Sequence, residues 1–350
     1  MFSNENKLTS LAELGEFGLI DHLTKNIKIK NPETKKGVGD DAAVLSFGDQ
    51  QTILTTDLLV EGVHFNLVYT PLKHLGYKAV IANLSDIYAM NAQPKQITVS
   101  IALSNKFSLQ SVEQLYEGIY TACDKYGVDL VGGDTSTSLT GLTISITAVG
   151  VADTENIVYR NTAQDNDLIC VSGDLGAAYM GLQLLEREKK LFLENTGFQP
   201  DLEGHDYILE RQLKPEARRD VIKMFKEMHL KPTSMIDISD GLSSDILHIC
   251  HDSGKGCKLF EDKIPIDPQT ILMAEEFNIS PVTAALNGGE DFELLFTMPL
   301  KEYDKIKGLP GITLIGHMTE KSEGSSLITS DGQTIALTAQ GWNNLSGQNQ

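Results

Sequence analysis

The chain has 350 residues, of which 41% are hydrophobic, 7% aromatic and 22% charged. These proportions are typical of a soluble globular protein, and the length suggests about two domains. Because 29 Lys and Arg stand against 48 Asp and Glu, the formal net charge is -19. Such a charge disfavours binding to nucleic acid or to an anionic membrane, whereas small phosphorylated molecules remain compatible if metal ions neutralise both sides.

The pattern of apolar residues predicts no signal peptide and no segment long enough to span a bilayer. The sparse cysteines form no C-x-x-C pair, so we expect reduced thiols and a cytoplasmic protein. A small cluster in HICHDSGKGC could alternatively bind zinc, although its spacing matches no standard finger. The cysteines and the clustered histidines are Cys123, Cys170, Cys250, Cys257, His248 and His251.

The first half of the chain alternates strand-like and helical patterns. Apolar residues at three- and four-residue steps predict helices over 72–90 and 108–126, the second capped at its C-terminal end by Gly127. Runs rich in Val, Ile and Thr predict half-buried strands. These strands are expected at 52–56, 96–103, 128–131 and 142–151.

The polar segment 153–166 is the expected boundary between two α/β domains, 1–153 and 154–350. Beyond it we expect helices over Ala177–Leu193, from Pro215 onward and after Gly241. Segment 194–206 reads as a surface loop. The expected strands lie at 167–171 and near 257–260, 292–297, 312–316 and 325–329.

Carboxylates recur beside glycines or at strand ends. Asp40 and Asp41 follow the glycine-spaced GVG, an arrangement that fits either a solvated turn or a cation site. Asp86 lies in an otherwise apolar helix, either on its solvent face or facing a partner. Asp240 could cap the following helix. The remaining members are Asp57, Asp134, Asp237, Asp245, Glu290 and Asp291.

Taken together, these acids predict a magnesium site. Their mutual repulsion must be offset in the folded chain, and Mg²⁺ typically binds a few carboxylates together with water and substrate phosphate. No Walker A, protein-kinase or Rossmann motif is present. Phosphate binding would therefore depend on Mg²⁺ and backbone N–H groups, with Arg160 as one basic candidate.

Eight motifs, in order, resemble the thiamine-monophosphate kinases of the aminoimidazole ribonucleotide synthetase superfamily. The resemblance extends from about residue 13 to Trp342. The motifs are GEFGLI, GVGDDAAVL, TTDLLVEGVHF, NLSDIYAMNAQP, VGGDTS, SGDLGAA, IDISDGLSSD and NGGEDFELLF.

The resemblance implies an α/β (α+β) fold of two domains, with the N-terminal sheet pairing in a homodimer. It implies Mg²⁺-assisted transfer of the γ-phosphoryl group of ATP to thiamine monophosphate, giving thiamine diphosphate in the last step of its biosynthesis. No strong base is needed, because the acceptor is itself a phosphate.

The resemblance also assigns roles to individual residues. The implied metal ligands are Asp41, Thr55, Thr56, Asp57, Asp86, Asp134, Asp237 and Asp240, of which Asp57, Asp86 and Asp237 are the catalytic ones. The implied ATP contacts are Tyr116, Gly133, Asp134, Arg160 and Ser239. The implied substrate contacts are His64, Glu290 and Trp342. Without the resemblance, His64 and Trp342 would be interpreted as packing residues and Arg160 as a surface charge.

Two alternatives stay open. Another ATP-dependent enzyme of the superfamily would share the fold, although EGVHF and NGGEDFELLF favour the thiamine enzyme. A non-catalytic protein that binds divalent metal is the other, but no EF-hand loop is present and the acids are scattered along the chain.

Overall fold

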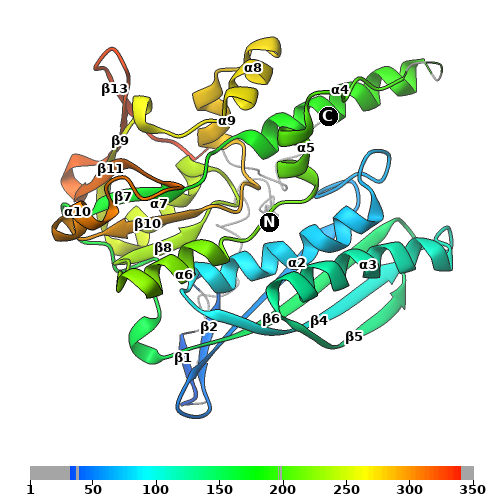
Figure 1. Cartoon of the computed structure of the whole chain (residues 1–350), viewed down its shortest axis with the longest axis horizontal. Coiled ribbons are helices and arrows are strands. Elements are labelled where there is room, and N and C mark those ends of the chain that lie inside the picture. Colours follow the sequence, from blue (N-terminus) through cyan, green and yellow to red (C-terminus); the bar gives the residue numbers. More distant parts are fainter. Residues whose placement is uncertain (1–31, 37–38, 196, 198, 340–350) are drawn as a thin grey trace, which may run out of the picture.

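The structure is a computed structural model of the chain, and it describes residues 32–36, 39–195, 197 and 199–339. Each half of the chain forms one mixed sheet, and helices pack on and between the two sheets (Figure 1). The GEFGLI motif and Trp342 lie outside the described residues. None of the helices that the structure describes is both long enough and apolar enough to cross a membrane.

The first sheet has the strand order β1-β2-β3-β6-β4-β5. Neighbouring strands are antiparallel except for β4 and β5, which are parallel. β6 alternates strictly between buried and half-buried residues, because one of its faces is covered by helices. The strands are β1 (Thr34–Lys36), β2 (Ala43–Ser46), β3 (Gln51–Val60), β4 (Gln93–Leu103), β5 (Asp129–Thr137) and β6 (Leu142–Ala152).

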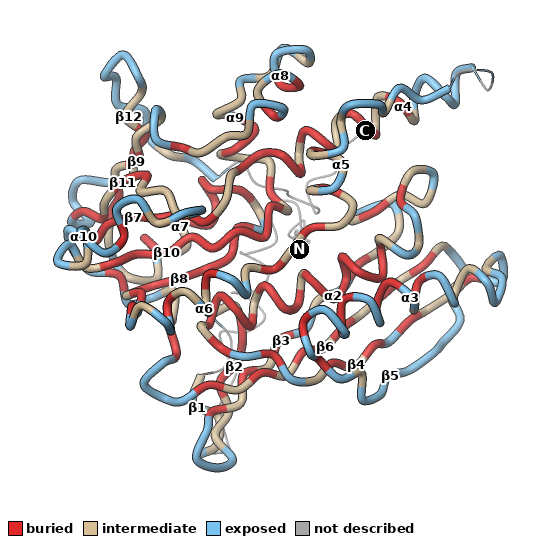
Figure 2. Tube along the Cα trace, in the orientation of Figure 1, coloured by how far each residue is buried: buried red, intermediate tan, exposed pale blue. Residues whose placement is uncertain are grey.

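Helices α2 (Leu72–Ala89) and α3 (Leu109–Tyr126) cover this sheet and cross each other closely. Two glycines allow the crossing, since a Cβ on Gly76 would lie 2.0 Å from the Leu115 carbonyl oxygen and one on Gly118 1.8 Å from that of Lys73. The α2 helix is buried on nearly all sides because it also contacts β8 and α5 of the second half (Figure 2).

The second sheet has the strand order β13-β12-β9-β11-β7-β10-β8. Only the β9–β12 pair is parallel among the described pairings. β7, β8 and β10 are buried at every position, because separate apolar clusters cover the two faces of the sheet. The strands are β7 (Leu168–Ser172), β8 (Ser234–Asp237), β9 (Lys255–Phe260), β10 (Leu294–Met298), β11 (Ile312–Glu320), β12 (Ser325–Ile328) and β13 (Thr334–Ala336).

Helices of the second half surround its sheet, and α4 and α5 pack against each other beside α2 (Figure 1). The helices are α4 (Ala177–Glu194), α5 (Asp206–Leu213), α6 (Arg219–Met228), α7 (Leu242–Ser253), α8 (Pro268–Glu276), α9 (Pro281–Asn287) and α10 (Tyr303–Ile306). Short 3₁₀ turns are η1 (Thr154–Asn156), η2 (Glu261–Lys263), η3 (Leu300–Glu302) and η4 (Lys321–Glu323).

The helices expected over 72–90, 108–126 and 177–193 are confirmed within one or two residues, including the αL cap at Gly127. The strand expected at 52–56 is longer, because β3 continues to Val60. The helix expected from Pro215 is wrong, because α6 begins only at Arg219. The intervening segment forms neither helix nor strand, and there the Glu216 carboxylate accepts hydrogen bonds from the hydroxyls of Tyr77 and Tyr126. The strand expected at 128–131 continues to Thr137, since its backbone pairs with β4 through both glycines.

The glycine crossing predicts a stability effect. We expect Gly118→Ala to lower the free energy of unfolding by about 1–3 kcal/mol, because the new methyl group forces α2 and α3 apart. Gly48→Ala is the matched control, since a Cβ there meets nothing within 4 Å. Urea unfolding measures both variants. Equal stability of the two would show that the helices can separate at no cost.

Candidate active site

The polar residues of α2 hold side chains from both halves of the chain. Asp86 Oδ2 accepts a 2.6 Å hydrogen bond from the Thr55 hydroxyl of β3. The Ser85 hydroxyl donates a 2.6 Å hydrogen bond to Asp237 Oδ2 at the end of β8. The sequence NLSD therefore faces partners rather than solvent, and the solvent-face interpretation of Asp86 is wrong.

Asp57 joins this group from β3. Its backbone N–H donates to the Asn83 side chain of α2 at 3.2 Å, which fixes the strand against the helix. Asp57 and Thr55 lie two residues apart, so their side chains point to the same face of the sheet. The sequence suggested that Asp57 follows the end of the strand, but Asp57 lies within β3.

Asp40 and Asp41 form a tight turn just before β2. The Asp40 side chain is fully enclosed and that of Asp41 is 8% exposed, yet Oδ2 of each has no hydrogen-bond partner among the described residues. Arg160 Nη1 lies 3.7 Å from Asp41 Oδ1, and Arg160 Nε donates to Asp252 of α7 at 2.8 Å. The solvated-turn interpretation of this pair is therefore wrong.

Burial raises the pKa of these carboxyl groups, and the charges of neighbouring acids add to the effect for Asp41, Asp86 and Asp237. Burial raises the pKa of Asp57 to about 6 and that of Asp237 to about 7, and for Asp237 the charge of Asp57 adds to the effect. Burial and the charges of Asp57, Asp237 and Asp41 raise the pKa of Asp86 well above its usual range. The pKa of Asp41 is raised by burial and by the charges of Asp237 and Asp40. These four aspartates, which we call the carboxylate cluster, thus act on one another electrostatically.

The turn after β8 brings further acids to the carboxylate cluster. The charge of Asp240 raises the pKa of both Asp237 and the buried Asp245. Asp240 does not cap α7, because Gly241 precedes that helix without a side-chain cap. Instead the Asp240 N–H donates to Asp245 Oδ2 at 3.3 Å. The sequence grouped Asp245 with the other acids, but the ligand set that the resemblance implied did not include it.

The Glu290 loop packs against this turn. The Glu290 N–H donates to the Ser239 carbonyl oxygen at 2.7 Å, and Glu290 has a left-handed φ of 56°. A Cβ on Gly289 would lie 2.5 Å from the Ser239 carbonyl oxygen, so glycine permits the contact. Ser239 itself is exposed. The motifs IDISDGLSSD and NGGEDFELLF, which are distant in sequence, therefore pack against each other at this turn.

His64 lies directly after β3 and has a defined tautomer when neutral. Its Nδ1 accepts a 3.0 Å hydrogen bond from the Val60 N–H, so the ring proton is on Nε2. Nε2 is therefore an N–H donor, the kind of group that can bind a phosphate or carbonyl oxygen.

Several predicted site residues lie apart from the carboxylate cluster. Thr56 points to the opposite sheet face, where its hydroxyl donates to the Ile146 carbonyl oxygen. Gly133 and Asp134 are exposed on β5, and three strand spacings separate Gly133 from Asp57 along one row of the sheet, about 14 Å. Tyr116 packs on the core of the first half, with its ring 6.0 Å from that of Tyr120.

The described residues contain no group of three His, Cys, Asp or Glu side chains arranged to hold a metal ion. The alternative zinc cluster is divided, because Cys250 and Cys257 are buried and hydrogen-bonded to each other. His251 is exposed and contacts Asp252.

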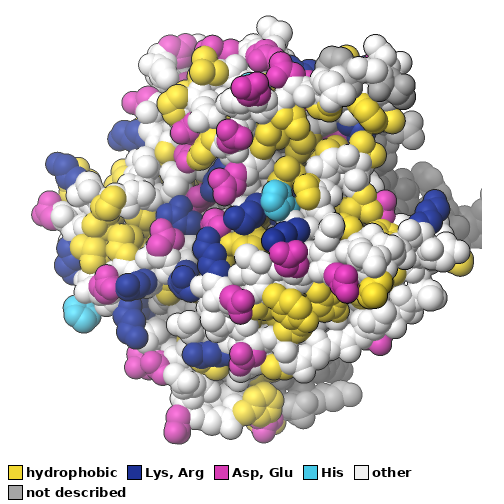
Figure 3. All heavy atoms as spheres, turned by 45° about the vertical axis from the view of Figure 1, so that its right-hand side comes forward, with side chains coloured by type: hydrophobic (Ala, Val, Ile, Leu, Met, Phe, Trp, Pro, Cys, Tyr) yellow, Lys and Arg dark blue, Asp and Glu magenta, His cyan; other side chains and the backbone are white. Residues whose placement is uncertain are grey.

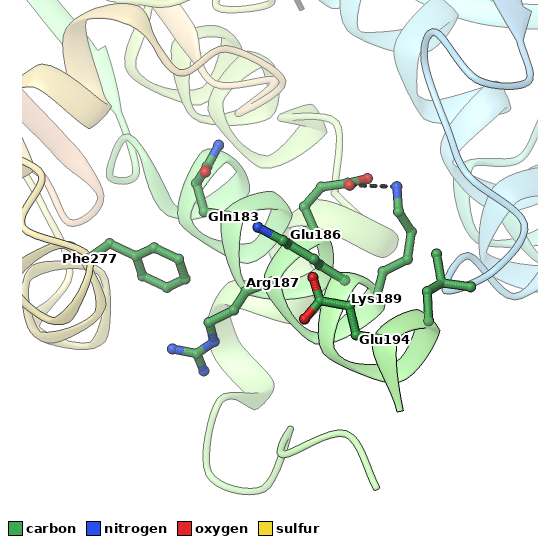
Figure 4. A pocket seen from close by; sticks show the side chains of 8 residues that line it. Gln183, Glu186, Arg187, Lys189, Glu194 and Phe277 are labelled. Carbon is green, nitrogen blue, oxygen red and sulfur yellow. Dashed lines mark hydrogen bonds and ion pairs between the residues drawn. The ribbon is translucent and has the colours of Figure 1, made fainter. Parts of the chain in front are cut away.

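Two surface cavities formed by the described residues lie away from the carboxylate cluster. One of about 680 Å³ runs along α4 and is closed on one side by Phe277, over which Arg187 stacks at 4.9 Å (Figure 4). Another of about 330 Å³ lies where α3, α5 and α6 meet. On the face seen in Figure 3, acidic side chains are scattered around a group of Lys and Arg near the middle. The net negative charge is thus not gathered on this surface.

Comparison with known proteins agrees with this geometry. The family "AIR synthase related protein, N-terminal domain" matches residues 39–152. The thiamine-monophosphate kinase of Aquifex aeolicus is 35% identical over 332 residues, covering 95% of this chain and 98% of that protein. That of Bacillus subtilis is 32% identical over 337 residues, covering 94% and 99%. The chain belongs to the thiamine-monophosphate kinase family.

Solved structures agree with the family assignment. The structure described as "AaThiL complexed with AMPPCP and TMP" superposes with a TM-score of 0.82 at 33% identity, covering 97% of this chain and all of that one. A hydrogenase maturation protein HypE in complex with ATP has a TM-score of 0.68 at 17% identity, which shows a shared fold alone. The expected α/β fold of the superfamily is therefore confirmed.

Sequence reasoning missed the residues that hold the site together. Asn83 holds the Asp57 backbone, Ser85 holds the Asp237 carboxylate and Asp252 holds Arg160. Lys78 and Gln212 contact Glu290. The signal was present for the first two, because NLSD places three polar residues in an apolar helix. Asp252 and Gln212 lie in ordinary helical patterns, so the sequence carries no signal of their contacts.

The raised pKa values predict how stability depends on pH. The folded chain keeps protons on Asp57 and Asp237 at pH values where the unfolded chain, with Asp pKa near 4, has lost them. The free energy of unfolding in EDTA should therefore fall as the pH rises from about 4 toward 7. Chemical denaturation across this range measures it. A rise of stability with pH would contradict the electrostatic account.

Removing one charge should relieve the repulsion. We expect Asp86→Asn to raise the free energy of unfolding in EDTA near pH 7.5 by about 1 kcal/mol or more. Asn keeps an acceptor for Thr55. Asp49→Asn, in the exposed segment between β2 and β3, is the control and should change little. Destabilisation by Asp86→Asn under these conditions would contradict the account.

Proposed function

We propose that the chain transfers the γ-phosphoryl group of ATP to the phosphate of thiamine monophosphate at the carboxylate cluster, with Mg²⁺ bound there. Family membership makes the chain an ATP-dependent kinase of thiamine monophosphate. The relative of TM-score 0.82 binds an ATP analogue together with TMP, which supports both substrates. The observation that carries the site is the gathering of four mutually repelling aspartates where the two halves of the chain meet.

The donor set fits Mg²⁺. Carboxylate and hydroxyl oxygens are the ligands of hard cations, and Oδ2 of Asp40 and of Asp41 has no hydrogen-bond partner among the described residues. Mg²⁺ in phosphoryl-transfer sites usually has one or two carboxylates, with water and substrate phosphates as the other ligands. A site completed by ATP needs no closed group of three acids. Asp41, Asp57, Asp86 and Asp237 would hold the ions, with Asp240 alongside.

Bound Mg²⁺ would neutralise phosphate charge and align the reacting groups. The chain's own residues orient the ligands beforehand. Thr55 donates a hydrogen bond to one oxygen of Asp86, and Ser85 donates one to one oxygen of Asp237. These bonds orient the second oxygen of each carboxylate. Arg160, held by Asp252, adds a cation beside Asp41 that can pair with a nucleotide phosphate.

The acceptor requires no strong general base, since its phosphate is already a nucleophile once its charge is screened. We propose that His64, through Nε2–H, and Glu290 contact the thiamine substrate, as does Trp342. Ser239, which lies on the turn that also holds Glu290, would contact ATP, together with Tyr116, Gly133 and Asp134. Thr56 and Asp134 remain proposed ligands, although both lie apart from the carboxylate cluster in one chain.

A homodimer would explain the exposed strand β5. This edge strand has nine residues, nearly all exposed, with Val131 60% exposed. Long uncovered edges are usually blocked or paired in soluble proteins. A partner strand there would also cover Gly133 and Asp134. The four free cysteines fit the proposed cytoplasmic location.

The activity is tested with purified protein, ATP, thiamine monophosphate and a Mg²⁺ titration, with products separated by chromatography. We expect thiamine diphosphate only when Mg²⁺ is present, and no product from unphosphorylated thiamine. Asp57→Asn should lower kcat about 100-fold or more while the chain stays folded by circular dichroism.

The control is Asp153→Asn, an exposed position that should leave kcat unchanged. Near-normal turnover of Asp57→Asn at low Mg²⁺ would contradict the metal assignment. ATP hydrolysis or binding without thiamine diphosphate would instead point to another substrate within the superfamily. Mg²⁺ binding without ATP binding would support a non-catalytic metal protein.

A further inference from the structure

Lys78 is a buried cation on α2 that reaches into the second half of the chain. Its side chain is 5% exposed, and Nζ lies 3.0 Å from Glu290 Oε2 and 2.9 Å from the Gln212 carbonyl oxygen of α5. An ammonium group enclosed to this degree is stable only when paired and hydrogen-bonded. Glu290 is therefore the partner on which the burial of Lys78 depends.

Glu290 is held by two side chains through the same oxygen. Gln212 Nε2 donates to Oε2 at 3.2 Å, beside Lys78. The carboxylate fixes the orientation of the Gln212 amide, because the reverse orientation would bring two acceptors together. Oε1 of Glu290 takes neither bond, and the side chain is 25% exposed. The loop thus presents one carboxylate oxygen with a set direction.

A second acceptor lies beside this oxygen. Gln212 is 5% exposed, and its Oε1 is buried with no hydrogen-bond partner among the described residues. An unsatisfied buried acceptor is costly, and such atoms in folded proteins are few. Lys78, Gln212 and Glu290 therefore form a network that can still accept N–H groups.

We propose that Lys78 and Gln212 are positioning residues that direct Glu290 Oε1 toward an N–H donor of the thiamine aminopyrimidine ring. The inference rests on the proposed function, in which Glu290 contacts the thiamine substrate. A carboxylate attracts the amine-bearing ring and repels the phosphate, so the acceptor binds with its phosphate directed away from Glu290. The pair thereby sets which end of the substrate faces the carboxylate cluster.

The spacing on α2 supports this orientation. Lys78 and Ser85 are seven residues apart, so both project from one face of the helix, separated by about 10 Å along its axis. Lys78 contacts Glu290, whereas Ser85 contacts Asp237 of the carboxylate cluster. One rigid helix thus fixes the separation between the ring contact and the reacting phosphate.

The test compares Lys78→Met with Lys73→Met. Lys73 is on the same helix and also forms an ion pair, with Glu117, but its side chain is 48% exposed. We expect Lys78→Met to raise KM for thiamine monophosphate about 10-fold or more, with kcat and KM for ATP nearly unchanged. Lys78→Arg should recover part of the loss. Lys73→Met should leave every constant unchanged.

A double-mutant cycle separates positioning from general destabilisation. The effect of Lys78→Met on KM should largely disappear in a Glu290→Gln background. Gln212→Leu, which keeps the ion pair, should also raise KM for thiamine monophosphate and provides the test if Lys78→Met does not fold. Equal loss of affinity for both substrates, or full additivity in the cycle, would overturn the proposal.

The outcomes separate a failure of this inference from a failure of the proposed function. If Glu290→Gln raises KM for thiamine monophosphate but neither Lys78→Met nor Gln212→Leu does, the positioning role is wrong and the substrate role of Glu290 stands. If Glu290→Gln itself has no effect on this KM, the substrate role fails and the inference fails with it. Absence of thiamine diphosphate from the wild-type chain would overturn the proposed function itself.

Discussion

The mutually repelling carboxylates gather where α2 meets β3 and β8. Their repulsion is the constraint that the contacts around the site must offset. Asp41, Asp57, Asp86 and Asp237 come from separate segments. Burial raises the pKa of each, and the charges of neighbouring carboxylates add to this for Asp41, Asp86 and Asp237. Arg160 is the cation beside Asp41. By contrast, the buried Glu293 in the second sheet is paired with Arg211 and Arg218. The chain neutralises Glu293 with its own arginines. In the proposed function, Mg²⁺ ions that arrive with the substrate phosphates would offset the charge of the cluster.

The α2 helix contributes both to the core of the first half and to the carboxylate cluster. Its apolar residues fill the core of the first half, and Gly76 lets α3 approach closely. Its polar residues make the site contacts: Asp86 accepts from Thr55, Asn83 accepts from the Asp57 backbone N–H, and Ser85 donates to Asp237. Because one helix contacts both sheets, the relative position of the two halves and the geometry of the site are fixed together. A shift of α2 would disturb every one of these contacts.

The long elements and the acid-rich motifs could be predicted from the sequence, because periodicity and glycine-acid patterns are local signals. Asp86 could not be placed, since an acid in an apolar helix fits a solvent face equally well until β3 supplies Thr55. The start of α6 was missed because Tyr77 and Tyr126, distant in sequence, hydrogen-bond to Glu216 in the irregular segment that precedes the helix. Lys78, Gln212 and Asp252 act through contacts between residues that lie 78 or more positions apart in the sequence. Such pairings leave no trace in local spacing.

The central claim is that the carboxylate cluster binds the divalent ions of phosphoryl transfer. The most direct measurement is anomalous scattering from Mn²⁺ in crystals grown with a non-hydrolysable ATP analogue and thiamine monophosphate. The account predicts Mn²⁺ peaks coordinated by oxygens of Asp41, Asp57, Asp86 or Asp237, between these residues and the nucleotide phosphates. Nucleotide bound without Mn²⁺ at these aspartates, or Mn²⁺ confined to other acids of the chain, would contradict it.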